Sequence, residues 1–414
     1  MKKLLTPLLA AAVGLTLLSG PSADARPAPA ARWHAAWGAA PQLPATGFTP
    51  NWSQEGFSRQ TVRQVVRLTE DGDRVRIRLS NAYGTSPLAV TGATIARTTA
   101  GASVDPGSVR HLTFGGERSV SVPARGELRS DPARLDVERL DSVTVTLYFA
   151  GTTGPATFHS QAWTDSYRAD GDHRADTDGR AFTARSQSWY YLSGVEVGGG
   201  TPPAKGGVVL FGDSITDSFG STPNANRRYS DALAERIDAP VVNSGIGGNL
   251  VLNDSAWYGE RSTARFRRDA LDQPGVTTVA LLQGLNDIGY SEAALKPDPH
   301  PTYKPSPVVT SAELIDAYRQ LIGAAHARGV RVIGSTLLPF KDTSHWGPTA
   351  ERTSAEVNHW IRTSGEFDAV VDFARLLADP RDAKALNPVY AHPDRLHPND
   401  AGYRLMAEAV APLL

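Results

Sequence analysis

Two segments of the C-terminal half carry the residue types that nucleophilic catalysis needs. Gly212-Asp213-Ser214 follows directly on an apolar run, and Asp394 and His397 lie three residues apart near the C-terminus. A serine hydroxyl becomes an effective nucleophile when a base takes its proton and a third group orients that base. On one loop, the aspartate can fix the imidazole tautomer and stabilise the imidazolium. The spacing therefore predicts a Ser214–His397–Asp394 site for acyl transfer.

Each of these residues also has an ordinary structural explanation. Ser214 alone fits a polar turn after a strand equally well. Asn399 or Asp400 is suited to cap a final helix, with Asp394 stabilising a turn. The two explanations are compatible for the histidine segment, because such a cap also fixes His397 in place.

Two further segments offer hydrogen-bond donors of the kind that an oxyanion hole requires. The segment 243–249 contains Gly245, Gly247 and Gly248, and glycines let a backbone N–H approach a ligand closely. The segment 284–287, Gly-Leu-Asn-Asp, adds the side-chain amide of Asn286. Either segment alone also fits an ordinary turn.

These segments follow short runs that are apolar on both faces, which is typical of a buried parallel sheet. The runs are Val208–Phe211, Val241–Asn243, Val276–Leu282, Val330–Thr336 and Ala369–Asp372. Helical segments lie between them. The clearest starts with a capping box at Thr310–Glu313 and ends near Gly329, and a last helix is predicted over Tyr403–Val410. The pattern predicts a doubly wound α/β layer, in which ligands bind beyond the carboxyl ends of the strands.

The N-terminal half has a different periodicity. Arginines at 74, 76 and 78 alternate with apolar residues at 75, 77 and 79, which predicts one charged and one apolar strand face. Glu70–Asp73 just before this run predicts a hairpin turn. We expect an antiparallel β-sandwich over residues 33–197, a linker over 198–204, and the α/β domain over 205–414.

In their order along the chain, the four segments resemble the SGNH hydrolases, the GDSL lipase/esterase superfamily. The matches are Gly-Asp-Ser at 212–214, Gly-Gly-Asn at 247–249, Gly-x-Asn-Asp at 284–287, and Asp-x-x-His at 394–397. The first block reads Gly-Asp-Ser-Ile where the name-giving motif ends in Leu, which is a common variant. The resemblance covers residues 205–414 and implies a flavodoxin-like, doubly wound parallel sheet of five strands.

The resemblance also implies roles for individual residues. Ser214 is expected to be the nucleophile, and His397 the general base and then the general acid. Asp394 would orient His397. The reaction would be two-step ester hydrolysis through an acyl-enzyme, with no metal and no organic cofactor. Asp213 and Asp287 are expected to brace loops.

The oxyanion hole implied by the resemblance consists of the backbone N–H groups of Ser214 and Gly248 and the amide of Asn286. The double glycine leaves Gly247 open as the alternative to Gly248. All implied positions are occupied by suitable residues, which favours an enzyme over a non-catalytic glycan-binding or surface-binding protein on the same fold.

The substrate is less defined than the chemistry. Six aromatic residues follow the predicted strands and fit either an acyl or sugar pocket or packing against the N-terminal domain: Trp257, Tyr258, Tyr290, Tyr303, Phe340 and Trp346. The proline-rich segment Pro297–Pro307 is suited to form a rigid rim. We expect a small-molecule, lipid or acylated-carbohydrate ester, and a carbohydrate O-acetyl esterase remains an alternative to a general esterase or lipase.

Composition excludes several other functions. The 414 residues carry a formal net charge of −1, so no global field favours nucleic acid or an anionic membrane surface. The chain has no cysteine, which excludes disulfides, thiol nucleophiles and a lipidated-cysteine anchor.

Lys2 and Lys3 precede an apolar run to Leu18, and Ala23-Asp24-Ala25 fits a cleavage site. We therefore expect a signal peptide over 1–25 cleaved near Ala25, a Pro/Ala-rich lead over 26–32, and a secreted monomer without a stable membrane anchor; an uncleaved anchor is the alternative.

Overall fold

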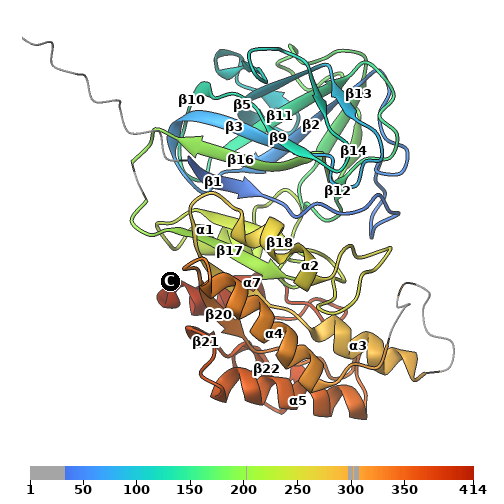
Figure 1. Cartoon of the computed structure of the whole chain (residues 1–414), viewed down its shortest axis with the longest axis vertical. Coiled ribbons are helices and arrows are strands. Elements are labelled where there is room, and N and C mark those ends of the chain that lie inside the picture. The colour runs from blue at the N-terminus through green and yellow to red at the C-terminus, as the bar shows by residue number, and fades with distance from the viewer. Residues whose placement is uncertain (1–32, 202, 297–301, 303–306) are drawn as a thin grey trace, which may run out of the picture. The chain divides into compact units, whose positions relative to one another are not determined.

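The computed structural model describes residues 33–201, 203–296, 302 and 307–414 (Figure 1). The predicted signal peptide (1–25) and the lead (26–32) lie outside the described residues. So does the predicted rim at Pro297–Pro307, apart from residues 302 and 307. The described N-terminal and C-terminal domains belong to one compact unit and contact each other within it.

Two antiparallel sheets form most of the N-terminal domain. The five-stranded sheet joins β1 (Trp33–Gly38), β16 (Leu192–Gly198), β3 (Gly72–Ser80) and β10 (Ala133–Val137), with β9 (Glu127–Arg129) on β3. The seven-stranded sheet joins β14 (Ala184–Ser186), β13 (Ser166–Asp170), β2 (Gln60–Arg67), β11 (Ser142–Phe149), β5 (Gly92–Ala100) and β6 (Ser103–Val104), with β7 (Arg110–Leu112) on β5. Two short pairs complete it: β4 (Leu88–Val90) with β8 (Val120–Val122), and β12 (Phe158–His159) with β15 (Trp189–Tyr190). A 3-10 turn, η1, spans Pro106–Ser108. The domain is antiparallel and β-rich, as the period-two pattern predicts.

The hairpin predicted at Glu70–Asp73 is wrong. β2 and β3 lie in different sheets, so the residues between them cross from one sheet to the other. The backbone N–H of Leu68 donates to Asp141 and that of Thr69 donates to Ala36, which holds the crossing in place. Acidic residues and glycine end a strand in both arrangements, so their presence alone does not distinguish a hairpin from a crossing.

The charged face predicted for β3 is only partly exposed. Val75, Ile77 and Leu79 are fully buried, as expected for the apolar face. Arg78, however, is also buried, and its guanidinium donates to the Ser193 carbonyl and the Gln273 side chain. At Arg78 this side of β3 therefore contacts the C-terminal domain through Gln273, whereas Arg74 on the same side is partly exposed.

The C-terminal domain is built on a five-stranded parallel sheet. Its order is β18 (Val241–Gly245), β17 (Gly207–Gly212), β19 (Val276–Leu282), β20 (Arg331–Ser335) and β21 (Ala369–Val371). All six residues of β17 are buried, as the two-sided apolar pattern predicts for a central strand. Numbered along the chain, the strand order is 2-1-3-4-5, which confirms the flavodoxin-like topology.

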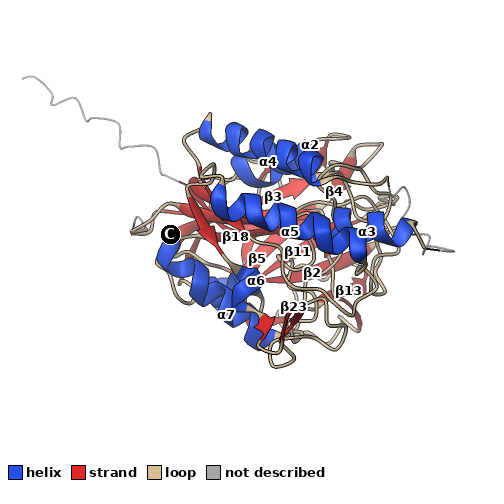
Figure 2. Cartoon of the chain, turned by 90° about the horizontal axis from the view of Figure 1, so that it is seen from below, coloured by secondary structure: helices blue, strands red, loops and turns tan. Residues whose placement is uncertain are grey.

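The helices form two groups. They are α1 (Tyr229–Ala234), α2 (Ser262–Phe266), the π-helical turn η2 (Arg267–Leu271), α3 (Leu285–Ala294), α4 (Ser311–His326), α5 (Pro348–Thr363), α6 (Phe373–Leu376), α7 (Asp400–Val410) and the 3-10 turn η4 (Ala411–Leu413). α1 packs against α7, and α5 packs against α3 and α4. Figure 2 shows strands of the sheet between α7 and α4. A short hairpin, β22 (Ala378–Asp379) with β23 (Asp382–Leu386), precedes α7.

The helix starts follow the predicted capping chemistry. Thr310 and Glu313 form a reciprocal capping box at the start of α4. Asn399 caps α7 by accepting the backbone N–H groups of Ala401 and Gly402, so this helix begins three residues earlier than predicted. Within the described residues, no helix is both long and apolar enough to cross a lipid bilayer.

Candidate active site

The parallel register brings the predicted site segments together at one edge of the sheet. Gly212, the last residue of β17, pairs with Gly245 on β18 and with Leu282 on β19. The residues that follow these three strands therefore leave the sheet at the same level. Ser214 is held in a tight turn, in which its carbonyl accepts the N–H of Phe219.

Ser214, His397 and Asp394 form a continuous hydrogen-bonded chain. Ser214 Oγ lies 2.8 Å from His397 Nε2, and His397 Nδ1 lies 2.7 Å from Asp394 Oδ2. Ser214 and His397 are buried, whereas the Asp394 side chain is partly exposed. Burial alone would raise the pKa of Asp394, but the hydrogen bond and the charge of His397 hold the pKa of this carboxyl well below its usual range. A carboxylate in this position favours the tautomer that presents Nε2 to the serine.

The loop that carries the histidine is fixed by its own backbone. Asp394 Oδ1 accepts the N–H groups of Leu396 and His397 at 2.9 and 3.0 Å. Asn399, directly after this loop, caps α7. The structural explanation of this segment, a helix cap and a turn held by Asp394, is therefore confirmed, and the same loop fixes the position of His397. The ring of Phe219 packs on the His397 ring with centroids 4.3 Å apart.

The predicted oxyanion donors lie just beyond the ends of β17, β18 and β19. Among the described residues, the backbone N–H groups of Ser214 and Gly248 donate to no protein acceptor. Gly248 has a φ of +72° in the turn closed by the Asn249 N–H and the Ile246 carbonyl, and a Cβ here would collide with the Tyr258 ring. The position therefore requires glycine.

The third predicted donor, Asn286, lies on the first turn of α3. Its side-chain amide donates to the Asn249 carbonyl at 3.2 Å, which ties α3 to the glycine turn. Gly284 precedes it with a φ of +109°, and a Cβ there would collide with the Tyr318 hydroxyl. The choice between Gly247 and Gly248 as donor stays a prediction.

Asp213 and Asp287 make the contacts of loop-bracing groups. Asp213 accepts the N–H of Ile215 at 3.0 Å, and Asp287 accepts those of Val251 and Leu252. Both carboxyls are fully buried, and burial raises the pKa of each to about 7. Neither carboxylate contacts His397 in the hydrogen-bond network of the described residues.

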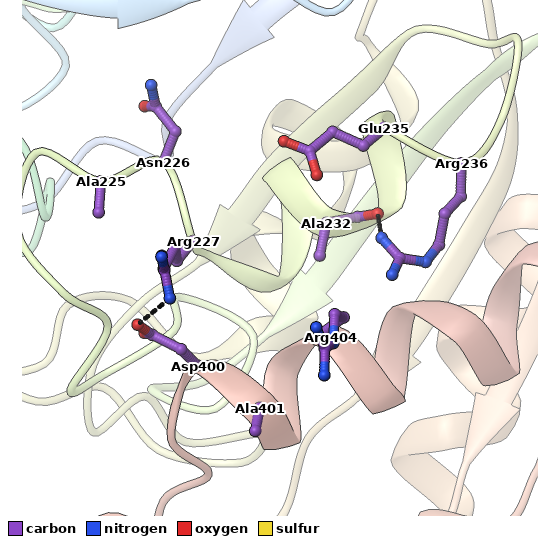
Figure 3. Close-up of a pocket in the computed structure, with 9 residues that line it drawn as sticks. All are labelled: Ala225, Asn226, Arg227, Ala232, Glu235, Arg236, Asp400, Ala401 and Arg404. Carbon is purple, nitrogen blue, oxygen red and sulfur yellow. Dashed lines mark hydrogen bonds and ion pairs between the residues drawn. The ribbon is translucent and has the colours of Figure 1, made fainter.

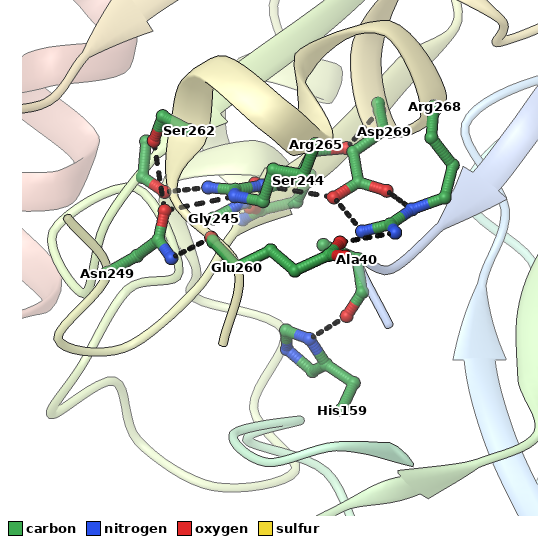
Figure 4. Close-up of polar contacts among 12 residues, drawn as sticks. Ala40, His159, Ser244, Gly245, Asn249, Glu260, Ser262, Arg265, Arg268 and Asp269 are labelled. Atoms are coloured by element: carbon green, nitrogen blue, oxygen red, sulfur yellow. Dashed lines mark hydrogen bonds and ion pairs between the residues drawn. The ribbon is translucent and has the colours of Figure 1, made fainter. Parts of the chain in front are cut away.

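Arg265 on α2 holds this region together, and its role was not predicted from the sequence. Its guanidinium donates to the Gly212 carbonyl at 2.7 Å. It also donates to the Ser244 carbonyl at 2.8 Å (Figure 4). A third bond reaches Asn249 Oδ1 at 2.9 Å, and the side chain pairs with Asp269. Arg265 is fully buried and therefore connects the ends of β17 and β18 to the glycine turn. A single arginine in a short helix is usually solvent-exposed, so its sequence position carries no indication of this role.

A buried pair, His159 and Asp217, joins the N-terminal domain to the turn that carries Ser214. His159 Nε2 lies 3.0 Å from Asp217 Oδ1. His159 Nδ1 lies 3.0 Å from the Ala40 carbonyl (Figure 4). Burial alone would lower the pKa of His159, but the Asp217 carboxylate raises it above the usual value. This pair also was not predicted, because its members belong to different domains.

The predicted aromatic residues divide between the site and the core. Tyr258 packs against Gly248, and the rings of Tyr258 and Tyr290 are 5.7 Å apart. Phe340 and Trp346 pack on each other in the hydrophobic core instead. Trp257 is exposed, and Tyr303 lies outside the described residues.

A surface cavity of about 390 Å³ lies away from this site, between α1 and α7 (Figure 3). Its arginines already have acidic partners. Arg227 pairs with Asp400, and Arg236 and Arg404 both approach Glu408. The cavity therefore presents no excess of unpaired charge for a ligand.

The topology and the site define the C-terminal domain as a doubly wound α/β domain with serine-hydrolase geometry at its strand ends. Residues 210–405 match the GDSL-like lipase/acylhydrolase family, which supports the superfamily resemblance predicted for the C-terminal domain. No curated protein sequence matches the chain significantly.

Solved structures with a similar arrangement share about one fifth of their aligned residues with this chain. A G-D-S-L family protein from Desulfitobacterium hafniense is 20% identical, with a TM-score of 0.38, over 51% of this chain and 100% of its own. A GDSL-like lipase from Bacteroides thetaiotaomicron is 19% identical, with a TM-score of 0.38, over 50% and 86%. A variant of the acetyl xylan esterase Axe2 from Geobacillus stearothermophilus is 21% identical, with a TM-score of 0.38, over 51% and 94%.

Proposed function

We propose that the protein is a secreted serine esterase or lipase that hydrolyses carboxylic acyl esters through an acyl-enzyme on Ser214. The observation that carries the proposal is the unbroken chain of hydrogen bonds from Ser214 Oγ through His397 to Asp394, at 2.8 and 2.7 Å. A serine with a base in hydrogen-bond contact, and a carboxylate behind that base, is the arrangement that activates a hydroxyl for attack.

In the first step, His397 Nε2 takes the proton of Ser214 as Oγ bonds to the ester carbonyl carbon. The carbonyl oxygen becomes an oxyanion, which the N–H groups of Ser214 and Gly248 and the amide of Asn286 stabilise. When this intermediate collapses, the bond to the alcohol oxygen breaks, and the imidazolium gives its proton to the leaving alkoxide. Asp394 stabilises the imidazolium while it exists.

In the second step, a water molecule attacks the acyl-enzyme and His397 takes the proton of that water. The bond between the acyl carbon and Ser214 Oγ then breaks, and the proton returns to Oγ. The carboxylic acid leaves and the free enzyme is restored. No redox partner is needed for either step.

Export is part of the proposal and rests on the N-terminal sequence. Two lysines, an apolar run and an Ala-x-Ala site in the first 25 residues have the order of a secretory signal peptide. N-terminal sequencing of protein recovered from the medium should give a start next to Ala25. A start at Met1 in membrane-bound protein would instead support an uncleaved anchor.

The esterase proposal is tested with purified mature protein and 4-nitrophenyl esters of two, four, eight and twelve carbons. The profile of kcat/KM against chain length separates an esterase from a lipase. Ser214→Ala should lower kcat/KM by at least about 10³-fold, because the nucleophile is lost. Ser221→Ala is a matched control, since this buried hydroxyl makes no hydrogen bond within the described residues.

Two outcomes would contradict the proposal. A folded wild-type protein that turns over none of the four esters would favour a non-catalytic binding protein on this fold. Full activity in Ser214→Ala would exclude Ser214 as the nucleophile even if the protein is an esterase.

A further inference from the structure

Three aromatic rings lie beside the Ser214–His397 pair, and one of them comes from the N-terminal domain. Phe219 packs on His397, and Tyr258 packs on Gly248. Phe48 contacts both: its ring meets Phe219 edge-on at 6.2 Å and stacks on Tyr258 at 5.6 Å. Phe48 therefore links the histidine side of the site to its oxyanion side.

Phe48 is also the most exposed member of this group. It is 44% exposed, whereas Tyr258 is 6% exposed. A stacked aromatic pair with one ring facing solvent offers a flat apolar surface next to the reacting groups. Its place beside the glycine turn distinguishes it from an isolated surface phenylalanine.

A second N-terminal segment reaches the same place. The side-chain oxygen of Gln161 lies so close to Gly247 that a Cβ there would collide with it. Gln161 is 3% exposed, and within the described residues neither atom of its amide has a hydrogen-bond partner. Burying an amide without a partner is costly, so this group is available to a hydroxyl or water at the site. Trp163, two residues further on, packs edge-on against Phe219 at 5.5 Å.

We propose that the N-terminal domain supplies one wall of the substrate site, on which Phe48 stacks against the sugar ring of an acylated carbohydrate and Gln161 hydrogen-bonds to one of its hydroxyls. This inference rests on the esterase function proposed above. It assigns the N-terminal domain to recognition of the alcohol portion of the ester.

The chemistry of the wall favours a sugar over other alcohols. The faces of a pyranose ring present C–H groups that pack on an aromatic surface, while its hydroxyls need polar partners. An aryl alcohol offers the flat face without those hydroxyls. A lipid glyceride offers neither a ring nor a reason for a buried amide beside the aromatic group.

The test compares three acetyl esters that share the acyl group: methyl 6-O-acetyl-glucopyranoside, phenyl acetate and trifluoroethyl acetate. The KM of each variant is divided by the wild-type KM for the same ester. This ratio removes the differences in leaving-group chemistry among the three esters. Phe48→Ala should raise KM for the two ring-bearing esters by about fivefold and leave trifluoroethyl acetate within about twofold. Phe48→Trp should restore the wild-type values, because it retains an aromatic face.

The Gln161→Leu variant should affect the two ring-bearing esters differently. It should raise KM for the glucopyranoside by about fivefold and leave phenyl acetate within about twofold, because only the sugar has hydroxyls to bind. Leu295→Ala is the control for all three esters, since Leu295 is 58% exposed and lies outside this wall. An unchanged KM in Gln161→Leu would assign this amide to the small internal cavity that it also lines and would overturn its role in sugar binding.

Equal effects of Phe48→Ala on ring-bearing and acyclic esters, or none, would overturn the stacking role while leaving the esterase function intact. Binding gives an independent readout. Calorimetric titration of Ser214→Ala with methyl 6-O-acetyl-glucopyranoside should show saturable binding that weakens about fivefold when Phe48→Ala is added. Absence of turnover in the wild type would reject the esterase function, and unchanged binding in the double variant would separately reject the wall.

Discussion

Oδ2 of Asp394 lies 2.7 Å from Nδ1 of His397, and the same oxygen lies 3.1 Å from Nδ1 of His392. One carboxylate thus approaches two imidazoles. Only His397 continues to Ser214, with its Nε2 at 2.8 Å from the serine oxygen. The geometry therefore separates the two histidines, although both are close to Asp394 in the sequence.

The first prediction follows from this difference. His397→Ala should lower kcat by at least about 10³-fold with little change in KM, because the proton acceptor of Ser214 is lost. His392→Ala is the matched variant and should change kcat by less than about fivefold, since His392 does not reach the serine. Steady-state kinetics on one short-chain ester measure both. A comparable loss in the two variants would mean that the base is shared or wrongly assigned.

The second prediction concerns Arg265 as a positioning residue. Arg265→Met removes the donors to the carbonyls of Gly212 and Ser244 and to the side chain of Asn249. We expect kcat to fall about 10- to 100-fold, because a small displacement of the glycine turn misplaces the oxyanion donors. The free energy of unfolding should fall by about 3–5 kcal/mol, because Asp269 loses a buried partner.

The matched variant for Arg265 is Arg268→Met. Arg268 also pairs with Asp269, but it is partly exposed and is not bonded to the strand ends. The Arg268→Met variant should have a lower free energy of unfolding than the wild type, without the loss of kcat expected for Arg265→Met. Kinetics measured well below the melting temperature of each variant separate the two effects. Equal kcat values for the Arg265 variant and the wild type would leave Arg265 with a purely structural role.

Local motifs made most of the C-terminal domain predictable. The strand ending at Gly212 and the capping box at Thr310 depend on residues close in sequence, and the structure contains both. The positions of Ser214, His397 and Asp394 at one sheet edge follow from strand order and from a loop of four residues. Their catalytic roles stay predictions.

The parts that escaped prediction depend on partners far apart in the chain. Arg265 acts on a carbonyl 53 residues earlier, and His159 meets an aspartate 58 residues later. No periodicity or spacing rule connects such pairs, because they form only once both elements have folded. The prediction of a hairpin at Glu70–Asp73 failed for the same reason. The strands before and after this segment, β2 and β3, pair with β11 and β16 and not with each other.

The third prediction is a pH-dependent stability from His159 and Asp217. The pKa of His159 is raised above its ordinary value of 6.5, so the protonated imidazole is favoured in the folded state. This contribution is fully present below pH 6.5 and is lost as pH rises through the raised pKa. The melting temperature of the wild type should therefore exceed that of His159→Asn most strongly near pH 6, and the gap should narrow towards pH 9.

A surface pair of the same type is the control for His159. His326 Nε2 lies 2.9 Å from Asp368 Oδ2, but both side chains are substantially exposed. His326→Asn should change stability by less than about 1 kcal/mol. A difference in melting temperature between the wild type and His159→Asn that stays constant across the pH range would contradict this prediction. It would mean that His159 stabilises the fold by packing alone and not by its charge.

The last prediction concerns the buried acid Asp213, whose contribution to stability also decreases as pH rises. Burial raises the pKa of Asp213 to about 7, so between pH 4 and 7 the folded state holds a proton that the unfolded state has released. The stability contributed by the neutral carboxyl is therefore present below the unfolded pKa and is lost as pH rises towards 7. Asp213→Asn keeps an acceptor for the Ile215 N–H without a charge, so its stability relative to the wild type should rise by on the order of 2 kcal/mol from pH 5 to pH 8. Asp131→Asn is the control, because hydrogen bonds from Gly116 and Thr113 lower the pKa of Asp131 below its ordinary value of 3.8. This carboxyl is therefore ionised in both the folded and the unfolded state at pH 5 and at pH 8, and the variant should show no pH trend between them. Denaturant unfolding at the two pH values measures both variants, and a pH-independent difference for Asp213→Asn would show that this carboxyl is ionised throughout.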